Sequence, residues 1–376
     1  MEKHLHIIDF TVPFPVDFGG VIDLFWKLPS LQNEGVKIHL HCFKNGRSEQ
    51  TELNKYCASV NYYERNEGHK AISAKLPYIV ASRKNETLLQ NLLNDEYPIL
   101  MDGVHSTYLL NDERFLHRRK FVRIHNVEHQ YYHQLAQSSS SFFKKIYYSR
   151  EEKLLNQYER SIVTRANAFW GVTNKDVNYY RNELNCKTID YLPVYLPNYW
   201  GLNCLEGKGN YCLYHGDLSV DTNDKAAKWL LKKIFSQLEI PFVIAGKNPS
   251  KELEHLAHQH LHTCIVANPG EKEIQDMIGK AHINILPSFS NTGIKLKLLN
   301  ALYNGKHCVT NAATCEGSDV EELCVITDSE EEMKTKIVDL YNQPFSKEDG
   351  EKRKKILSEQ FSNEANAKQQ VKWIWG

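Results

Sequence analysis

Short apolar runs recur along this chain, and stretches with apolar residues at helical spacing lie between most of them. In the C-terminal half these runs do not alternate with polar residues, which is typical of strands buried on both faces of a parallel sheet. Their alternation with helices predicts right-handed βαβ units and a doubly wound α/β sheet. The expected strands are 211–215, 242–245, 264–266, 283–286, 307–310 and 324–327, and the expected helices are 224–238, 251–260, 271–280 and 294–303.

The N-terminal half shows the same alternation less regularly, which predicts a second doubly wound domain. Its expected strands are 6–10, 37–43, 60–63, 79–82, 99–102, 121–125 and 169–172, and its expected helices are 21–31 and 142–164. Prolines and glycines cluster between the halves and predict a linker there. The expected organisation is an N-terminal domain 1–197, a linker 198–210, a C-terminal domain 211–353 and a terminal helix 354–376. Because open parallel sheets bind ligands at the carboxyl ends of their strands, we expect the two domains to face each other across a ligand-binding cleft.

Charge and cysteine content narrow the class of protein. Lysine plus arginine and aspartate plus glutamate number 46 each, so there is no general basic field and no nucleic-acid partner is expected. Nine cysteines without CxxC pairs predict reduced thiols and argue against a disulfide framework or a zinc ribbon. No apolar run approaches the ~20 residues that span a bilayer, and the apolar stretch at the N-terminus is too short for a signal peptide. We therefore expect a cytoplasmic protein.

The stretch 286–306 carries the strongest chemical signal. A polar turn follows an apolar strand, Gly293 marks the expected start of a helix, and Gly305 ends that helix. The start of a helix has unsatisfied backbone N–H groups and the positive end of the macrodipole, which together attract phosphate. Lys295 and Lys297 add positive charge in the expected first turn, so we expect an anionic ligand. Two alternatives stay open, namely that Gly293 only permits a tight turn and that the lysines are solvated.

Six segments follow one another along the chain in a recognisable order. They are 15–20, 123–128, 191–198, 214–218, 243–246 and 291–302, the last followed by Gly305. They comprise a glycine loop after the first strand, a strand-end histidine segment, a crossing between domains, two strand ends and a donor motif. In this order they resemble the retaining nucleotide-sugar glycosyltransferases of the GT-B fold, the bacterial group that builds capsule and lipopolysaccharide glycans. The resemblance implies two Rossmann-like domains and a terminal helix that returns toward the N-terminal domain.

The resemblance also implies a division of labour, in which the C-terminal domain binds a nucleotide diphosphate sugar and the N-terminal domain binds the acceptor. Backbone N–H groups of Gly293 and Ile294 would meet the pyrophosphate, and Lys295 or Lys297 would neutralise it. Because these groups would stabilise the leaving phosphate, no metal ion and no cofactor is expected. The other implied donor-binding residues are Gly19, Gly20, Gly216, Gly246, Lys247, Thr292 and Asn300; for Lys247, a surface-loop position is the alternative.

The expected reaction is transfer of the sugar to a glycan or lipid-linked acceptor with retained anomeric configuration, by attack on the face that the phosphate leaves. One departure from the family's pattern bears on this reaction. The family's donor motif usually carries two glutamates where this chain has Thr292 and Asn300. The amide of Asn300 can bond a ribose hydroxyl, whereas Thr292 brings no carboxylate to the donor sugar. A catalytically weak nucleotide-sugar-binding member of the same fold therefore stays open as an alternative.

On the acceptor side, the candidate catalytic residues are His125, which would contact the sugar, and Asp102, which would position an acceptor hydroxyl. The alternatives are a structural histidine and a turn formed by Asp102 and the following glycine. His125, Glu128 and His129 also match the H-x-x-E-H motif of zinc peptidases, so a zinc hydrolase is a further hypothesis. That motif needs both histidines on one face of a helix, whereas His125 follows an expected strand.

Two other groups of residues leave alternatives open. The segment 142–148 mixes aromatic residues with two lysines and either contacts a membrane-bound acceptor, at the inner face of a membrane, or packs into a core with a solvated edge. Histidines at 255, 258, 260 and 262 form either a weak metal site or a polar helix end.

Overall fold

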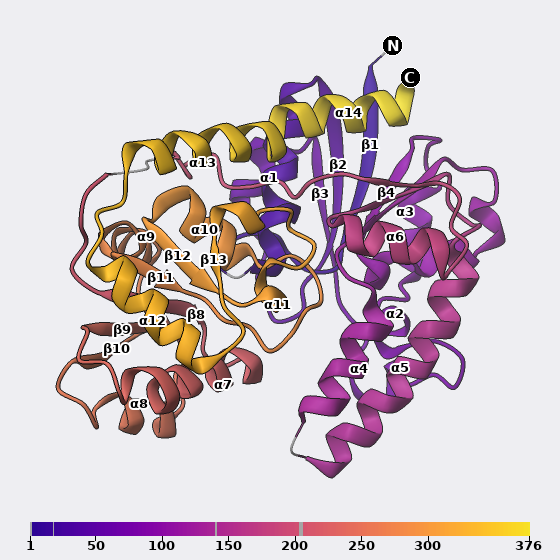
Figure 1. The fold of residues 1–376 in the computed structure, drawn as a ribbon. Coiled ribbons are helices and arrows are strands. Elements are labelled where there is room, and N and C mark those ends of the chain that lie inside the picture. The colour runs from indigo at the N-terminus through magenta and orange to yellow at the C-terminus, as the bar shows by residue number, and fades with distance from the viewer. Residues whose placement is uncertain (1, 18, 140, 203–205) are drawn as a thin grey trace. The chain divides into compact units, whose positions relative to one another are not determined.

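The computed structural model describes residues 2–17, 19–139, 141–202 and 206–376. The chain divides into two compact units, Met1–Pro197 with Phe361–Gly376 and Asn198–Gln360. Each unit has its own parallel sheet with helices packed on it (Figure 1). Among the described residues, no helix combines the length and the apolar character that a membrane span requires.

The sheet of the first unit has seven parallel strands in the order β3-β2-β1-β4-β5-β6-β7. Its strands are β1 Lys3–Asp9, β2 Val36–Phe43, β3 Ser59–Tyr63, β4 Ile99–Asp102, β5 Lys120–Ile124, β6 Ala168–Gly171 and β7 Ile189–Tyr191. Its α-helices are α1 Gly19–Asn33, α2 Tyr78–Ala81, α3 Glu86–Leu92, α4 Glu128–Ser138, α5 Phe142–Ile162, α6 Asn174–Asn182 and α14 Asn363–Trp375. Short 3-10 helices are η1 Thr51–Lys55, η2 Gly68–Ala71, η3 Val104–Ser106, η4 Tyr108–Asn111 and η5 Glu113–Phe115. Because β1 pairs with both β2 and β4, the chain winds outward in two directions from the centre of the sheet.

Apolar residues cover both faces of this sheet, which explains why its central strands are continuous apolar runs in the sequence. The last helix, α14, packs against α1 on one of these faces. Trp373 stacks on the fully buried Trp170 with ring centroids 5.5 Å apart, and Ile374 is also fully buried. The end of the chain therefore contributes to the core of the first unit.

The sheet of the second unit has six parallel strands in the order β10-β9-β8-β11-β12-β13. Its strands are β8 Cys212–Asp217, β9 Phe242–Lys247, β10 Thr263–Ala267, β11 Ile283–Ile285, β12 His307–Thr310 and β13 Val325–Ile326. Its helices are α7 Asp221–Trp229, the π-helical η6 Leu230–Phe235, α8 Lys251–Ala257, α9 Glu271–Lys280, α10 Leu296–Asn304, α11 Ala312–Cys315, the 3-10 helix η7 Glu321–Leu323, α12 Glu330–Tyr341 and α13 Lys347–Gln360.

The structure departs from the expected elements in several places, and the expected helix 224–238 is one of them, because it is divided between α7 and η6. The expected strand 79–82 is wrong, because these residues form the short helix α2, whose first N–H, that of Tyr78, donates to the carboxylate of Glu151. Strand β7 was not expected, because it is three residues long and includes Asp190. The expected single helix 354–376 is divided between α13 and α14.

Candidate functional site

The expected donor residues of the second unit lie where β8, β9 and β11 end. Gly216 in β8 pairs with Gly246 in β9. A Cβ atom on Gly246 would lie 1.9 Å from the carbonyl oxygen of Gly216 and 2.8 Å from Cγ of Leu218. Lys247 ends β9, and its carbonyl oxygen accepts the N–H of Leu218 at 2.9 Å. Glycine at position 246 is thus required by the close approach of the two strand ends, independently of any ligand.

Lys297 is held by two neutral groups at this edge. Its half-buried Nζ donates to the hydroxyl of Tyr214 and to Oδ1 of Asn223, both at 3.0 Å. The ammonium also lies 4.6 Å from the centroid of the Tyr214 ring, which is a cation–π distance. Burial lowers the pKa of Lys297 to about 7, and nearby Lys295 contributes to the shift. Among the described residues no carboxylate pairs with Lys297, so its charge is available to an anionic ligand.

His215 is a neighbour that sequence reasoning missed. It lies in β8 with 4% of its surface exposed, and its Nε2 has no hydrogen-bond partner among the residues described. Burial, followed by the charge of Lys297, lowers the pKa of His215 to about 3, so the imidazole is neutral at pH 7. The sequence offered one sign of it, because His215 lies between Tyr214 and Gly216 in the expected strand end 214–218. A buried histidine in a strand usually has a structural role, however, so this position alone did not mark it as functional.

The helix after β11 begins later than expected. Gly293 has φ of +60° in a loop, Lys295 is the N-cap with φ −91° and ψ 88°, and α10 starts at Leu296. The expectation that Gly293 and Ile294 open the helix is therefore wrong, because both residues lie before the N-cap. The positive end of the helix is at Leu296 and Lys297 instead, so Lys297 belongs to the first turn, where the backbone N–H groups lack partners within the helix.

Polar side chains hold the loop before α10 in place. Ser288 and Asn311 exchange two hydrogen bonds, at 2.9 and 2.8 Å, and the hydroxyl of Ser290 lies 3.2 Å from that of the buried Thr292. Nζ of Lys295 donates to the carbonyl oxygen of Thr292. These contacts bring Thr292 and Lys295 together in one structured loop.

Asn300 contacts its own helix instead. Its Oδ1 accepts a hydrogen bond of 2.8 Å from Asn304, one turn further along α10. Within the second unit the structure thus joins Lys297 to β8 and α7, and Thr292 to Lys295, but it gives Asn300 a local partner.

A buried group of charged residues occupies the corresponding edge of the first unit, where β4 and β5 end and α1 begins. Nζ of Lys27 donates to both carboxylate oxygens of Asp102, at 2.6 and 2.7 Å. Arg123 donates to both oxygens of Asp23, at 3.1 and 2.9 Å. Each carboxylate therefore has a buried cation, which is the condition for keeping charges inside a protein.

These pairings explain the protonation of the carboxyl groups. Burial opposes the charged forms, but Arg123 and Lys27 hold the pKa of Asp23 well below its ordinary value, and Lys27 holds that of Asp102 below it. Asp9, which ends β1, has no hydrogen-bond partner for either oxygen among the described residues. Burial, and then the charge of Asp102, raise the pKa of Asp9 well above its ordinary value. Both effects favour the neutral form of Asp9, and in that form the two remaining carboxylates balance two cations.

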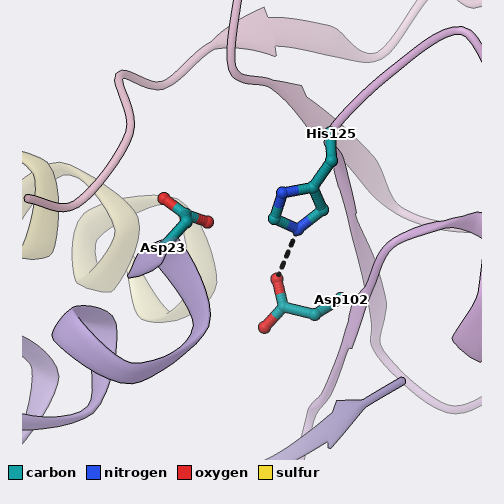
Figure 2. A group of neighbouring side chains, drawn as sticks. All are labelled: Asp23, Asp102 and His125. Carbon is teal, nitrogen blue, oxygen red and sulfur yellow. Dashed lines mark ion pairs between the residues drawn. The ribbon is translucent and has the colours of Figure 1, made fainter. Parts of the chain in front are cut away.

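His125 lies at the border of this group. Figure 2 shows its ring and the carboxylate of Asp102 pointing toward each other, with Asp23 approaching from α1. Nε2 of His125 is 3.6 Å from Oδ1 of Asp102, which is longer than a hydrogen bond, and has no other partner in the described part of the chain. The candidate residues His125 and Asp102 are thus neighbours, and Gly19 and Gly20 are the exposed first residues of the helix that carries Asp23.

Asp23, Asp102 and His125 could also offer three metal ligands, because their ligand atoms lie within 4.8 Å of one another. The group does not fit a divalent cation, however, because Arg123 and Lys27 already neutralise the two carboxylates. Asp23 and Lys27 were missed by sequence reasoning. Their signal was a pair of charges, four positions apart, within the otherwise apolar helix 21–31.

The zinc-hydrolase hypothesis is not supported. His125 precedes α4, so only Glu128 and His129 lie on the helix. Nδ1 of His129 is 2.6 Å from the carboxylate of Glu159, and its Nε2 is 2.9 Å from the hydroxyl of Tyr179. Burial, and then Glu159, raise the pKa of Glu128 to about 8. Both ring nitrogens of His129 are therefore occupied by protein groups. In the described ranges, the histidines near 255–262 do not belong to any group with metal-ligand geometry.

Comparison with known proteins gives a family match and a fold. Residues 209–343 match the family model described as "Glycosyl transferases group 1". These residues run from just before β8 to just after α12 and include Tyr214, Asn223 and Lys297. A Klebsiella pneumoniae protein described as "Uncharacterized 44.6 kDa protein in cps region" is 25% identical over 344 residues, which cover 86% of this chain and 87% of that protein.

Solved structures resemble the chain along its whole length. The crystal structure of TarM covers 100% of this chain and 99% of its own, with 11% identity and a TM-score of 0.71. The fold is GT-B. HepE from Anabaena, solved in complex with UDP, covers 99% of both chains with 11% identity and a TM-score of 0.64. A mutant of S. aureus TarM, whose complex also contains UDP, covers 100% of both chains with 10% identity and a TM-score of 0.65.

Proposed function

We propose that this protein is a glycosyltransferase that transfers a sugar from a nucleotide diphosphate sugar to a glycan or lipid-linked acceptor. The family match over 209–343 and the GT-B fold support a transferase. The UDP in the HepE and TarM complexes supports a nucleotide-sugar donor. The K. pneumoniae relative in a cps region supports a role in polysaccharide biosynthesis.

The observation that carries the proposal is the placement of Lys297 within the matched region. Tyr214 and Asn223 fix the position of its ammonium, and Lys297 is the second residue of α10, in the first turn of that helix. A pyrophosphate bound there would meet a full positive charge and the positive end of a helix. We assign the donor pyrophosphate to this position, with Thr292 and Lys295 in the adjoining loop, and Asn300 to the ribose.

The proposed reaction retains the anomeric configuration. The bond between the anomeric carbon and the phosphate oxygen breaks, and the acceptor oxygen forms its bond on the same face of the sugar. The acceptor proton passes to the departing phosphate oxygen, whose charge Lys297 stabilises without a metal ion. On the first unit, His125 would contact sugar hydroxyls. Asp102, held by Lys27, would act through the position of His125, because its charge is already engaged.

Calorimetry with UDP, GDP and ADP tests the donor site. Lys297→Ala should weaken the binding of the preferred nucleotide by about 1.5–3 kcal/mol, the range for hydrogen bonds to charged groups. Lys336→Ala is the matched control, because Lys336 is exposed on α12 of the same unit. An unchanged Kd in Lys297→Ala would remove this lysine from the site, and no binding of any nucleotide at millimolar concentration would contradict the proposed donor.

A catalytically weak nucleotide-sugar-binding protein is the second candidate. It is favoured by the absence of a carboxylate at Thr292 and by the engagement of Asn300 with Asn304. Nucleotide release from UDP-, GDP- and ADP-sugars distinguishes the two. Tight nucleotide binding without release in the presence of acceptor glycans would support the weak member. Release that continues in the presence of EDTA would support a metal-independent transferase.

A further inference from the structure

The helical hairpin α4–α5 exposes an unusual run of residues where α5 begins. The two helices lie side by side in the first unit and extend away from its strands (Figure 1). All six residues from 142 to 147 are exposed. Phe142 is 70% exposed, Phe143 83%, Ile146 54% and Tyr147 39%. Single exposed apolar residues are common on protein surfaces, but a contiguous group of four indicates an interaction surface.

The charge of this region is one-sided. From 129 to 150 the sequence has no aspartate or glutamate but contains Lys144, Lys145 and Arg150. Of the two glutamates that follow, Glu151 is fully buried and Glu152 pairs with His133 at 3.1 Å. Among the residues that the structure describes, Lys144, Lys145 and Lys153 have no ion-pair partner. Because the chain as a whole has equal numbers of acidic and basic residues, this local excess is balanced elsewhere in the sequence.

A shallow hollow on α5 brings the cations and the apolar group together. Its volume is about 610 Å³, and Lys145, Arg150 and Lys153 line it next to Ile146. Arg150 is partly engaged, because it pairs with Glu151. The two lysines leave space for phosphate groups directly beside the exposed apolar side chains.

We propose that the start of α5, residues 142–153, docks on the surface of an anionic lipid bilayer. Phe142, Phe143 and Ile146 enter the boundary between headgroups and acyl chains, where aromatic and aliphatic side chains are stable. Lys144, Lys145 and Lys153 bind lipid phosphates at the depth of the headgroups, with their alkyl stems along the apolar group. The charge of the region favours this partner over a second copy of the chain, because two such surfaces would repel each other.

Co-sedimentation of the full-length protein with vesicles tests the proposal. Vesicles of phosphatidylcholine with phosphatidylglycerol should bind it, whereas vesicles of phosphatidylcholine alone should not, and binding should weaken as salt rises. Lys144→Glu/Lys145→Glu should lower the partition coefficient at least on the order of tenfold, because each lysine near an anionic surface strengthens binding about fivefold. Phe142→Ser/Phe143→Ser should reduce binding even at low salt.

Matched controls separate docking from general effects on charge or folding. Lys354→Glu/Lys355→Glu changes an exposed lysine pair on α13 of the other unit, and Leu261→Ser removes an exposed apolar side chain there. Both should bind vesicles like the unaltered protein, and circular dichroism should show that all variants are folded. Equal binding by the α5 variants and their controls, or no binding of the unaltered protein to anionic vesicles, would overturn the proposal. Self-association that depends on Phe142 and Phe143 without lipid binding would assign the surface to a second copy.

Discussion

At the edge of the first sheet buried cations face carboxylates, whereas at the edge of the second sheet Lys297 faces only neutral oxygens. Lys27 and Arg123 are each paired with an aspartate within 3.1 Å. Lys297 contacts a phenol and an amide, and its pKa is lowered to about 7. The first arrangement is complete without a ligand, while the second has a positive charge that an anion would stabilise. The comparison separates charges that maintain the fold from a charge that can bind a substrate.

The largest expected effect on stability follows from removing one of the paired cations of the first unit. Lys27→Met should lower the free energy of unfolding by about 3–5 kcal/mol, because it leaves the buried carboxylate of Asp102 without its cation. Urea denaturation followed by circular dichroism measures the change. A loss below about 1 kcal/mol would show that Lys27 does not hold the charge of Asp102.

Lys297→Met is the matched substitution in the second unit. It removes a cation that has no carboxylate partner, so the free energy of unfolding should change by less than about 1 kcal/mol. Urea denaturation followed by circular dichroism measures this change as well. If Lys297→Met and Lys27→Met were equally destabilising, the difference between the two edges would not exist.

The pH dependence of nucleotide binding sharpens the comparison. Since the pKa of Lys297 is about 7, the free protein loses this positive charge as pH rises above 7. The contribution of Lys297 to nucleotide affinity should be greatest below pH 7 and fall by up to about tenfold per pH unit between pH 7.5 and 9.5. Calorimetry across this range measures the slope, and Lys297→Ala should remove it.

The contribution of Lys297 to folding stability should change with pH in the direction opposite to that of nucleotide affinity. Its folded-state pKa lies below the ordinary lysine value, so the unfolded chain binds more protons between these two values. Stability should therefore rise with pH in that window while nucleotide affinity falls. A parallel fall of both quantities would indicate general unfolding at high pH.

Asp9 gives the smallest expected effect. Because burial and the charge of Asp102 raise the pKa of Asp9 and favour its neutral form, Asp9→Asn should change the free energy of unfolding by less than about 1 kcal/mol. The comparison is Asp102→Asn, which removes the partner of Lys27 and should destabilise more strongly. Equal losses in the two variants would show that Asp9 carries a charge in the folded protein.

The sequence predicted the fold well where strands are continuous apolar runs. Strand 99–102 and helix 271–280 occur with their expected bounds, because burial on both faces and helical spacing leave strong patterns. Helix α2 was mistaken for a strand because four apolar residues fit either structure, and Glu151, distant in sequence, accepts its first N–H. Short apolar runs do not contain that information.

The site was less predictable, because it depends on contacts between distant residues. The importance of Lys297 was expected from the sequence, but its partners Tyr214 and Asn223 lie 83 and 74 positions away. The start of α10 was placed too early, because a glycine after a strand does not reveal whether it belongs to a loop or to the helix. The pairing of Asp102 with Lys27 requires two elements separated by 75 positions to pack together.

The close approach at Gly246 limits how the donor site can be dissected. Any side chain at this position would strike the main chain of Gly216, so the sheet would have to distort before a ligand arrived. Loss of activity in a Gly246 variant would thus report a damaged scaffold, and mutational mapping of this edge has to rely on side chains that can be shortened in place.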